Sequence, residues 1–226
     1  GGTAEARALA QQLACDPRLF LVTSLAGRTR APTLPPGAVR IGGFGGMPGL
    51  VQFLCRERID AVLDATHPFA RQISRAALTA CAALGLPYLR LERRPWQPTS
   101  GDRWIVVTDV EAALAAACQA GATIFVNLPR VDWPRLASCR AARFILRTVD
   151  PHPPFAEHIT MVAARPPYTV AGDRELFERM RVDCLLVRNA GGTGAYAKLI
   201  AARELGLPVI MIARPPPEVG PWVEDP

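Results

Sequence analysis

Short runs of apolar residues alternate along the chain with longer stretches whose apolar positions recur at helical spacing. The apolar runs predict strands at Leu19–Thr23, Ala38–Ile41, Ala61–Leu63, Tyr88–Leu91, Ile105–Val107, Thr123–Val126, Phe144–Leu146, Leu185–Val187 and Val209–Ile212. The longer stretches predict helices at Ala4–Leu13, Leu50–Glu57, Ala70–Leu84, Val110–Ala120, Arg174–Arg181 and Ala195–Leu205. Such alternation is typical of βαβ units, whose strands form parallel sheets covered by helices on both faces.

The segment 93–102 interrupts this alternation. It contains two prolines, a glycine and several polar residues, a composition typical of a linker. We therefore predict two α/β halves of comparable size, residues 1–100 and 101–226, each with its own parallel sheet. A single large sheet is the alternative. The proline-rich stretch 214–217 predicts an extended tail.

Composition narrows the class of protein. Half of the 226 residues are apolar, which is enough for a sizeable core and excludes a disordered tail or a collagen-like fibre. No apolar stretch reaches the roughly eighteen residues of a membrane-spanning helix, so we expect no membrane partner. The six cysteines are scattered without a C-x-x-C pair, which predicts free thiols in a reducing cytoplasm. His152 and His158 lack the spacing of metal ligands, so we predict no metal site.

The formal net charge is +6, and arginine supplies nearly all of the positive charge because Lys198 is the only lysine. The planar fork of arginine suits carboxylates and phosphates, so the charge is compatible with an anionic ligand. A coding bias toward G and C also produces such a composition. No dense basic run with interleaved aromatic residues is present, so we expect no nucleic acid partner.

A glycine-rich turn, Gly1-Gly2-Thr3, opens the predicted helix Ala4–Leu13. The unbonded N–H groups and the dipole of a helix N-terminus favour an anion, so this turn is a candidate nucleotide site. The preceding strand and the complete G-x-G-x-x-G fingerprint are absent from the sequence given. An ordinary tight turn is therefore the alternative.

Two further loops follow predicted strands in the first half. The first contains Ser24, Gly27 and Arg28, at the place where a dinucleotide fold meets the adenosine ribose. An acidic residue there prefers NAD, whereas hydroxyl groups and an arginine suit the 2′-phosphate of NADP. The second loop, Gly42–Gly46, permits close backbone approach to a ligand. The alternative for both is a solvent-exposed loop without a ligand.

The segment Asp64–Ala70 lies at the carboxyl end of a predicted strand, where ligands gather in open α/β sheets. His67 is able to donate, accept or shuttle a proton near neutral pH. Alternatively, Asp64 and Thr66 only cap the following helix. In the second half, Arg188–Lys198 repeats the order of strand, glycine-rich turn and helix, and would suit a substrate carboxylate. A glycine turn with an exposed lysine is the alternative.

Several of these phrases occur together in one known family. They are Gly1–Glu5, Ser24–Thr29, Gly42–Gly46, Asp64–Ala70, Asn189–Gly192 and Lys198–Ile212. In this order they resemble the precorrin-6A reductases of cobalamin biosynthesis, over nearly the whole chain. The resemblance implies two Rossmann-like domains with parallel sheets flanked by helices and an active-site cleft between them. It also implies NADPH as the hydride donor and reduction of one double bond of precorrin-6A, a polyanionic tetrapyrrole, to give precorrin-6B.

The resemblance also implies site residues. The expected nucleotide contacts are Gly1, Gly2, Thr3, Ser24, Gly27, Arg28, Gly43, Asp64, Thr66 and His67. The expected substrate contacts are Asn189, Gly191, Gly192, Thr193 and Lys198. His67, or a water that it orients, is the candidate proton source. The loop Asn127–Arg130 lacks the glycine-containing turn of the family and is left out of the expected site.

The resemblance further implies a cytoplasmic enzyme without a metal of its own, with other enzymes of the cobalamin pathway as potential partners. Three other functions compete with this interpretation. One is reduction of the cobalt-containing form of the same substrate, used in the anaerobic pathway. Another is a non-catalytic nucleotide-binding sensor on the same fold. The third is a methyltransferase that uses S-adenosylmethionine, because that class also has glycine-rich strand–helix turns.

Overall fold

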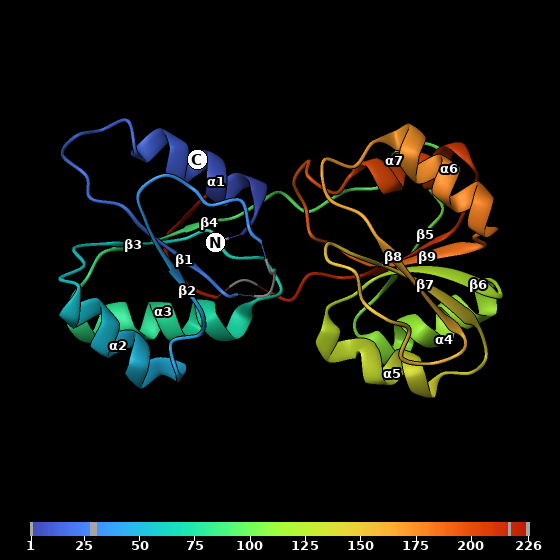
Figure 1. Cartoon of the computed structure of the whole chain (residues 1–226), viewed down its shortest axis with the longest axis horizontal. Helices are drawn as coiled ribbons and strands as arrows, with labels where there is room; N and C mark the ends of the chain where they lie inside the picture. The colour runs from blue at the N-terminus through green and yellow to red at the C-terminus, as the bar shows by residue number, and fades with distance from the viewer. Residues whose placement is uncertain (1, 28–30, 217, 225–226) are drawn as a thin grey trace. The chain divides into compact units, whose positions relative to one another are not determined.

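The computed structural model describes residues 2–27, 31–216 and 218–224. The chain forms two compact units, residues 1–94 with 216–226 and residues 95–215 (Figure 1). The expected division at residue 100 therefore lies six residues too late and assigns the C-terminal segment to the wrong half. That segment returns to the first unit because the strand β11 (Trp222–Val223) pairs in parallel with β4 (Tyr88–Leu91).

The described part of the first unit contains three helices and further strands beside β4 and β11. The helices are α1 (Ala4–Leu13), α2 (Gly46–Arg56) and α3 (Arg71–Leu84), and the strands are β1 (Val22–Leu25), β2 (Ala38–Ile41) and β3 (Val62–Asp64). The Thr3 side chain caps α1 by accepting a hydrogen bond from the Ala6 N–H. Gly85 ends α3 in the left-handed conformation that glycine adopts without a steric penalty.

The strands of the first unit form two parallel sheets instead of the single sheet that the sequence predicts. One sheet pairs β1 with β2, and the other has the order β11-β4-β3. Between them the described residues form no hydrogen-bonded strand pair. A small core joins α2 and α3 around Leu50, Leu54 and Ala80. Burial of a leucine side chain stabilises such a core by about 1.5–3 kcal/mol.

The second unit has one parallel sheet with the order β5-β10-β9-β6-β7-β8. Its strands are β5 (Trp104–Val107), β6 (Thr123–Asn127), β7 (Arg143–Thr148), β8 (Ile159–Ala163), β9 (Cys184–Arg188) and β10 (Val209–Ile212). Its helices are α4 (Val110–Ala120), α5 (Trp133–Ser138), α6 (Val170–Met180) and α7 (Ala197–Glu204), with a 3₁₀ turn η1 at Arg130–Asp132. Helices α4 and α5 cover one face of the sheet, and α6 and α7 cover the other (Figure 1). This arrangement buries Phe125, Ile145 and Leu185 completely.

Some local predictions are wrong. Strand β1 begins at Val22 instead of Leu19, because pairing with β2 starts at Val22 and leaves Phe20 86% exposed. Strand β8, helix α5 and strand β11 have no strong periodic pattern, and the sequence predicts none of them. The chain beyond the proline-rich stretch is not an extended tail, because β11 and Glu218 both contact the first unit.

Two negative findings concern the described parts of the chain. In residues 2–27, 31–216 and 218–224 no helix is long and apolar enough to cross a membrane. Within the same ranges, no three His, Cys, Asp or Glu side chains form a group that could hold a metal ion.

Candidate active site

The N-terminus of α1 lies against the loop that follows β3. The Thr3 hydroxyl donates a hydrogen bond to the Ala65 carbonyl oxygen at 3.4 Å, while it also caps α1. Among the described residues, a side-chain carbon added at Gly2 would meet no atom within 4 Å, so on that side the backbone before α1 is not covered by them. The charge of Glu5 in the first turn is offset by an ion pair with Arg93 at 3.6 Å. The turn is therefore open to an anion, and the helix dipole favours one there.

The loops after β1 and β2 also lie against each other. Gly27 has a φ of +71°, and a side-chain carbon there would lie 3.3 Å from Ile41. The loop after β2 is held by Arg40, whose guanidinium donates to the carbonyl oxygens of Gly42 and Gly43 at 2.6 and 2.5 Å. Arg40 also donates to the Ser24 hydroxyl at 3.4 Å. It is a cation at these strand ends that the sequence motifs did not single out.

Gly1 and Arg28, two of the expected nucleotide contacts, lie outside the described residues. The structure places Gly2 and Thr3 beside the loop after β3, and Ser24, Gly27 and Gly43 together at the ends of β1 and β2. All belong to the first unit.

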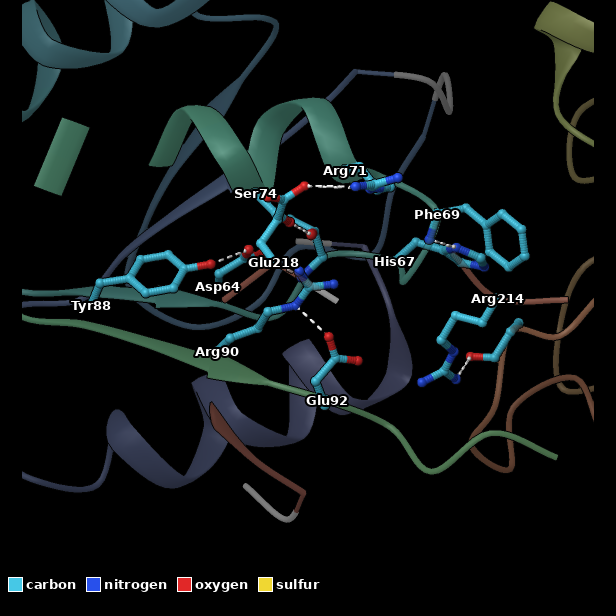
Figure 2. Close-up of polar contacts among 12 residues, drawn as sticks. Asp64, His67, Phe69, Arg71, Ser74, Tyr88, Arg90, Glu92, Arg214 and Glu218 are labelled. Atoms are coloured by element: carbon cyan, nitrogen blue, oxygen red, sulfur yellow. Dashed lines mark hydrogen bonds and ion pairs between the residues drawn. The ribbon is translucent and has the colours of Figure 1, made fainter. Parts of the chain in front are cut away.

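Asp64 organises the loop after β3 (Figure 2). Its carboxylate accepts hydrogen bonds from the Tyr88 hydroxyl at 2.8 Å and from the Thr66 N–H at 3.0 Å. The Thr66 hydroxyl lies 3.0 Å from that of Ser74 on α3. Burial opposes the charge of Asp64, but hydrogen bonds from Ser74, Thr66 and Tyr88 outweigh it and lower the pKa of the carboxyl group. Asp64 and Thr66 thus hold the loop in place through contacts within the first unit.

The ring of His67 is oriented by its own loop. Its Nδ1 accepts a hydrogen bond from the Phe69 N–H at 3.2 Å, and its ring lies 5.8 Å from the Phe69 ring (Figure 2). An imidazole that accepts at Nδ1 carries its proton on Nε2. The proton of the neutral His67 ring therefore lies on Nε2, and protonation of Nδ1 would break the hydrogen bond with the Phe69 N–H, because both groups would then be donors.

In the second unit, Asn189 clamps the chain around Trp96. Its side-chain oxygen accepts from the Trp96 N–H at 2.8 Å, and its side-chain nitrogen donates to the Trp96 carbonyl oxygen at 2.9 Å. The Trp96 indole N–H in turn donates to the Gly192 carbonyl oxygen at 2.7 Å. Both polar ends of the Asn189 side chain are engaged in this clamp.

The rest of this loop contains the other expected substrate contacts. Gly191 and Gly192 have positive φ values of 66° and 68°, which glycine adopts without strain. Thr193 follows them and is exposed. The loop therefore presents backbone and a hydroxyl group at the carboxyl end of β9, which suits a polar ligand.

Lys198 is buried in the core of the second unit and is only 1% exposed. Its ammonium donates to the Ala195 carbonyl oxygen and lies 4.9 Å from the Trp96 ring. Burial and, to a smaller extent, the positive charge of Arg147 lower the pKa of Lys198, while Asp173 raises it, and the net result is a pKa of about 7. The alternative of an exposed lysine is therefore wrong, and the ammonium group is shielded from solvent.

The strand order of the second unit reveals a candidate that the sequence interpretation left out. Strands β6 and β9 are neighbours, with Asn127 paired to Val187, but β6 leads to α5 and β9 leads to α7 on the opposite face. Ligands in open α/β sheets bind at such a switch point. The loop after β6 ends at Arg130, which is exposed and lies 5.5 Å from the ring of Trp133.

An aromatic group lies beside this arginine. The rings of Trp133 and Phe155 stack at 5.1 Å, and His152 meets Trp133 edge-on at 4.9 Å. The buried Trp133 indole N–H makes no hydrogen bond in the described part of the chain. No short sequence motif marks Arg130, because the switch point depends on strand order.

Comparison with protein families places these sites in context. The family model described as "Precorrin-6x reductase CbiJ/CobK" matches residues 1–226. A precorrin-6A reductase from Rhodobacter capsulatus is 48% identical over 217 residues, which are 95% of this chain and 86% of the relative. One from Rhodococcus erythropolis is 44% identical over an alignment of 230 residues, which covers 100% of this chain and 92% of the relative.

A more distant relative and a solved structure complete the comparison. A cobalt-precorrin-6A reductase from Priestia megaterium is 30% identical over 186 residues, 76% of this chain and 71% of the relative. The solved structure "CobK precorrin-6A reductase" superposes with a TM-score of 0.88 at 46% identity, covering 98% of this chain and 89% of that one. The sequence and the fold of this chain are thus both similar to those of precorrin-6A reductases.

Proposed function

The chain belongs to the precorrin-6x reductase family, and from this premise we propose that it reduces precorrin-6A with NADPH to give precorrin-6B. It is an oxidoreductase of cobalamin biosynthesis. The observation that carries the proposal is the agreement over the full chain with relatives named for this substrate. Relatives named for the cobalt-containing substrate are less similar, which favours the metal-free macrocycle.

We assign the nucleotide to the first unit. Gly2 and Thr3 would meet its diphosphate through the N-terminus of α1, where the described residues leave one side of the backbone uncovered. Ser24 and Arg28 would bind the 2′-phosphate, with Gly27 and Gly43 allowing close approach. Arg40 supports this second region from the end of β2. When bound, NADPH supplies the hydride.

We assign the macrocycle to the second unit. The backbone of Gly191–Thr193 and the guanidinium of Arg130 would bind its carboxylates at the switch point between β6 and β9. Asn189 and Lys198 are expected from the sequence to contact substrate, but their polar groups are engaged within the unit, by Trp96 and by the Ala195 carbonyl oxygen. They would instead hold the Gly191–Thr193 loop in place through these contacts. The active-site cleft expected between the two halves stays a prediction.

His67 completes the proposal in the first unit. The imidazole of His67, or a water molecule that it orients, would deliver the proton, and the hydrogen bond from the Phe69 N–H to Nδ1 would keep the ring oriented. Asp64 and Thr66 would act indirectly by fixing the loop that positions His67.

The test is an assay of the purified chain with precorrin-6A, following NADPH consumption and the macrocycle spectrum together. We expect consumption of one NADPH per macrocycle, and a lower kcat/KM with NADH because the 2′-phosphate contacts are lost. Nucleotide binding without turnover of either macrocycle would support the sensor instead. If only the cobalt-containing macrocycle is reduced, the chain is the reductase of the anaerobic pathway. If the chain does not bind NADPH, the methyltransferase is favoured.

Replacement of His67 by alanine is expected to lower kcat about 100-fold, the lower end of the range for a lost proton-transfer group. The dissociation constant for NADPH should change little. His67→Gln, which keeps an N–H donor, should recover part of the rate. Steady-state kinetics with nucleotide titrations measures both quantities, and an unchanged kcat in His67→Ala would make the residue structural.

Replacement of Arg130 by alanine is expected to raise the KM for the macrocycle at least tenfold, because a charge-assisted hydrogen bond contributes about 1.5–3 kcal/mol. The KM for NADPH should stay unchanged. Arg143→Ala is the matched control, since Arg143 is an exposed arginine at the amino-terminal end of β7, whereas Arg130 follows the carboxyl end of the neighbouring strand β6. Equal effects of the two variants would reject a specific contact and leave only the loss of net charge.

A further inference from the structure

Two cysteines that are distant in sequence lie in contact in the second unit. The sulfur of Cys118, on α4, lies 3.5 Å from that of Cys139, the residue that caps the C-terminus of α5. Both residues are partly exposed, and neither takes part in the proposed nucleotide or substrate site. Of the other four cysteines, Cys15 and Cys55 are exposed and Cys81 is buried, all in the first unit. Cys184 is buried in β9, where its thiol donates to the Ala117 carbonyl oxygen.

We propose that Cys118 and Cys139 form a dithiol modification site that a hydroperoxide oxidises to an intramolecular disulfide. The sulfur atoms must approach from 3.5 Å to the disulfide bond length of about 2.05 Å. This is a displacement of about 1.5 Å shared between two short side chains. Cys139 has an extended backbone at the end of a helix, with φ −88° and ψ 98°, so one partner lies where the regular helix has already ended.

The electrostatics of the pair decide the order of events. Burial and the neighbouring Cys139 sulfur raise the pKa of Cys118 to about 11, so Cys118 keeps its proton near neutral pH. Cys139 also lies beyond the last turn of α5, whereas Cys118 lies within α4, and on both grounds we assign the first attack to Cys139. Its thiolate attacks one oxygen of hydrogen peroxide, the O–O bond breaks, and a sulfenic acid forms while hydroxide leaves and takes a proton to become water.

The second step closes the bridge. The Cys118 sulfur gives up its proton and attacks the sulfur of the Cys139 sulfenic acid, the S–O bond breaks, and the oxygen leaves as water. Overall, two thiols lose two electrons and two protons, and one hydrogen peroxide is reduced to two molecules of water. The bridge would link α4 to the end of α5 on the same face of the sheet (Figure 1).

The experiment treats the purified full chain with hydrogen peroxide, quenches it with a thiol-alkylating reagent, and maps the peptides by mass spectrometry. We expect a peptide pair joined between Cys118 and Cys139, with loss of two alkylatable thiols and recovery of both after dithiothreitol. Cys118→Ser and Cys139→Ser should each abolish the linked pair. Cys15→Ser is the matched control and should leave it intact, because Cys15 lies in the other unit.

Three outcomes would overturn the proposal. They are sulfinic or sulfonic acid at Cys139 without a linked pair, linkage of either cysteine to a second copy of the chain, and oxidation of Cys15 or Cys55 while the pair remains reduced. Cys118→Ser should also accumulate sulfenic acid at Cys139, trapped by a sulfenic-acid reagent. If sulfenic acid accumulates at Cys118 in Cys139→Ser but not at Cys139 in Cys118→Ser, Cys118 attacks the peroxide first and the assigned order is wrong.

Discussion

Replacing Lys198 by methionine is expected to stabilise the protein by several kcal/mol at pH 6 and to have little effect near pH 10. The lysine is only 1% exposed, and burial lowers its pKa to about 7 from the ordinary value of 10.5. Below pH 7 both the folded and the unfolded chain carry the charge, and the folded chain bears the full desolvation cost.

The pH dependence follows from proton uptake. Between about pH 7 and pH 10.5 the unfolded lysine binds a proton that the folded one does not, so the free energy of unfolding of the parent chain rises with pH in this window. Methionine has a similar volume and no charge, so Lys198→Met should lose this rise. One unit of pKa shift corresponds to about 1.4 kcal/mol, which sets the scale of the difference.

Urea denaturation of both chains at pH 6, 8 and 10 measures this effect. The difference in unfolding free energy between the two chains should shrink steadily as the pH rises. If the two free energies instead change with pH in the same way, the pKa of Lys198 is not lowered by folding, and the prediction is wrong. Lys198→Arg is the contrasting variant, because arginine stays charged throughout and should be destabilising at every pH. The KM for the macrocycle should change much less in Lys198→Met than in Asn189→Leu, because methionine fills a similar volume behind the loop, and an increase as large as that of Arg130→Ala would restore Lys198 as a substrate contact.

Replacing Asn189 by leucine is expected to destabilise the second unit by about 2–6 kcal/mol, because two backbone groups of Trp96 lose their partners at about 1–3 kcal/mol each. The same change should raise the KM for the macrocycle and leave that for NADPH unaltered, since the clamp holds the Gly191–Thr193 loop. Steady-state kinetics with both substrates separates these effects.

The control for this variant is Asn127→Leu, an identical change at an exposed asparagine at the end of the neighbouring strand β6. It should change the free energy of unfolding by less than about 0.5 kcal/mol. Amide hydrogen exchange offers a direct readout, because the Trp96 N–H should lose protection in Asn189→Leu only. Retained protection there would show that another acceptor replaces the asparagine.

The Asn189 clamp lies next to both points at which the chain passes from one unit to the other. Trp96 is the second residue of the second unit, and Arg214 is the last but one. Arg214 donates to the carbonyl oxygens of Asn189 and Ala190 at 3.5 and 3.1 Å. Both connections between the units are therefore fixed to one loop, the loop that we assign to the substrate.

The sequence alone determined the alternation of strands and helices, the α/β class with parallel sheets, and the family. These properties are local: apolar runs such as Val209–Ile212 become buried strands, and Thr3 and Gly85 set helix ends through their own backbone and side-chain chemistry. The motif Asp64–Ala70 was found because its residues are contiguous, so no knowledge of pairing was needed.

Only the tertiary structure decided which side chains are engaged and which loops are neighbours. Lys198 and Asn189 look like exposed ligands in sequence, but packing places the lysine in the core and the asparagine against Trp96. The site at Arg130, the sulfur contact of Cys118 with Cys139 and the return of β11 to the first unit all join residues far apart in the chain. Strand order and side-chain burial create such contacts, and neither is encoded in the periodicity of any single segment.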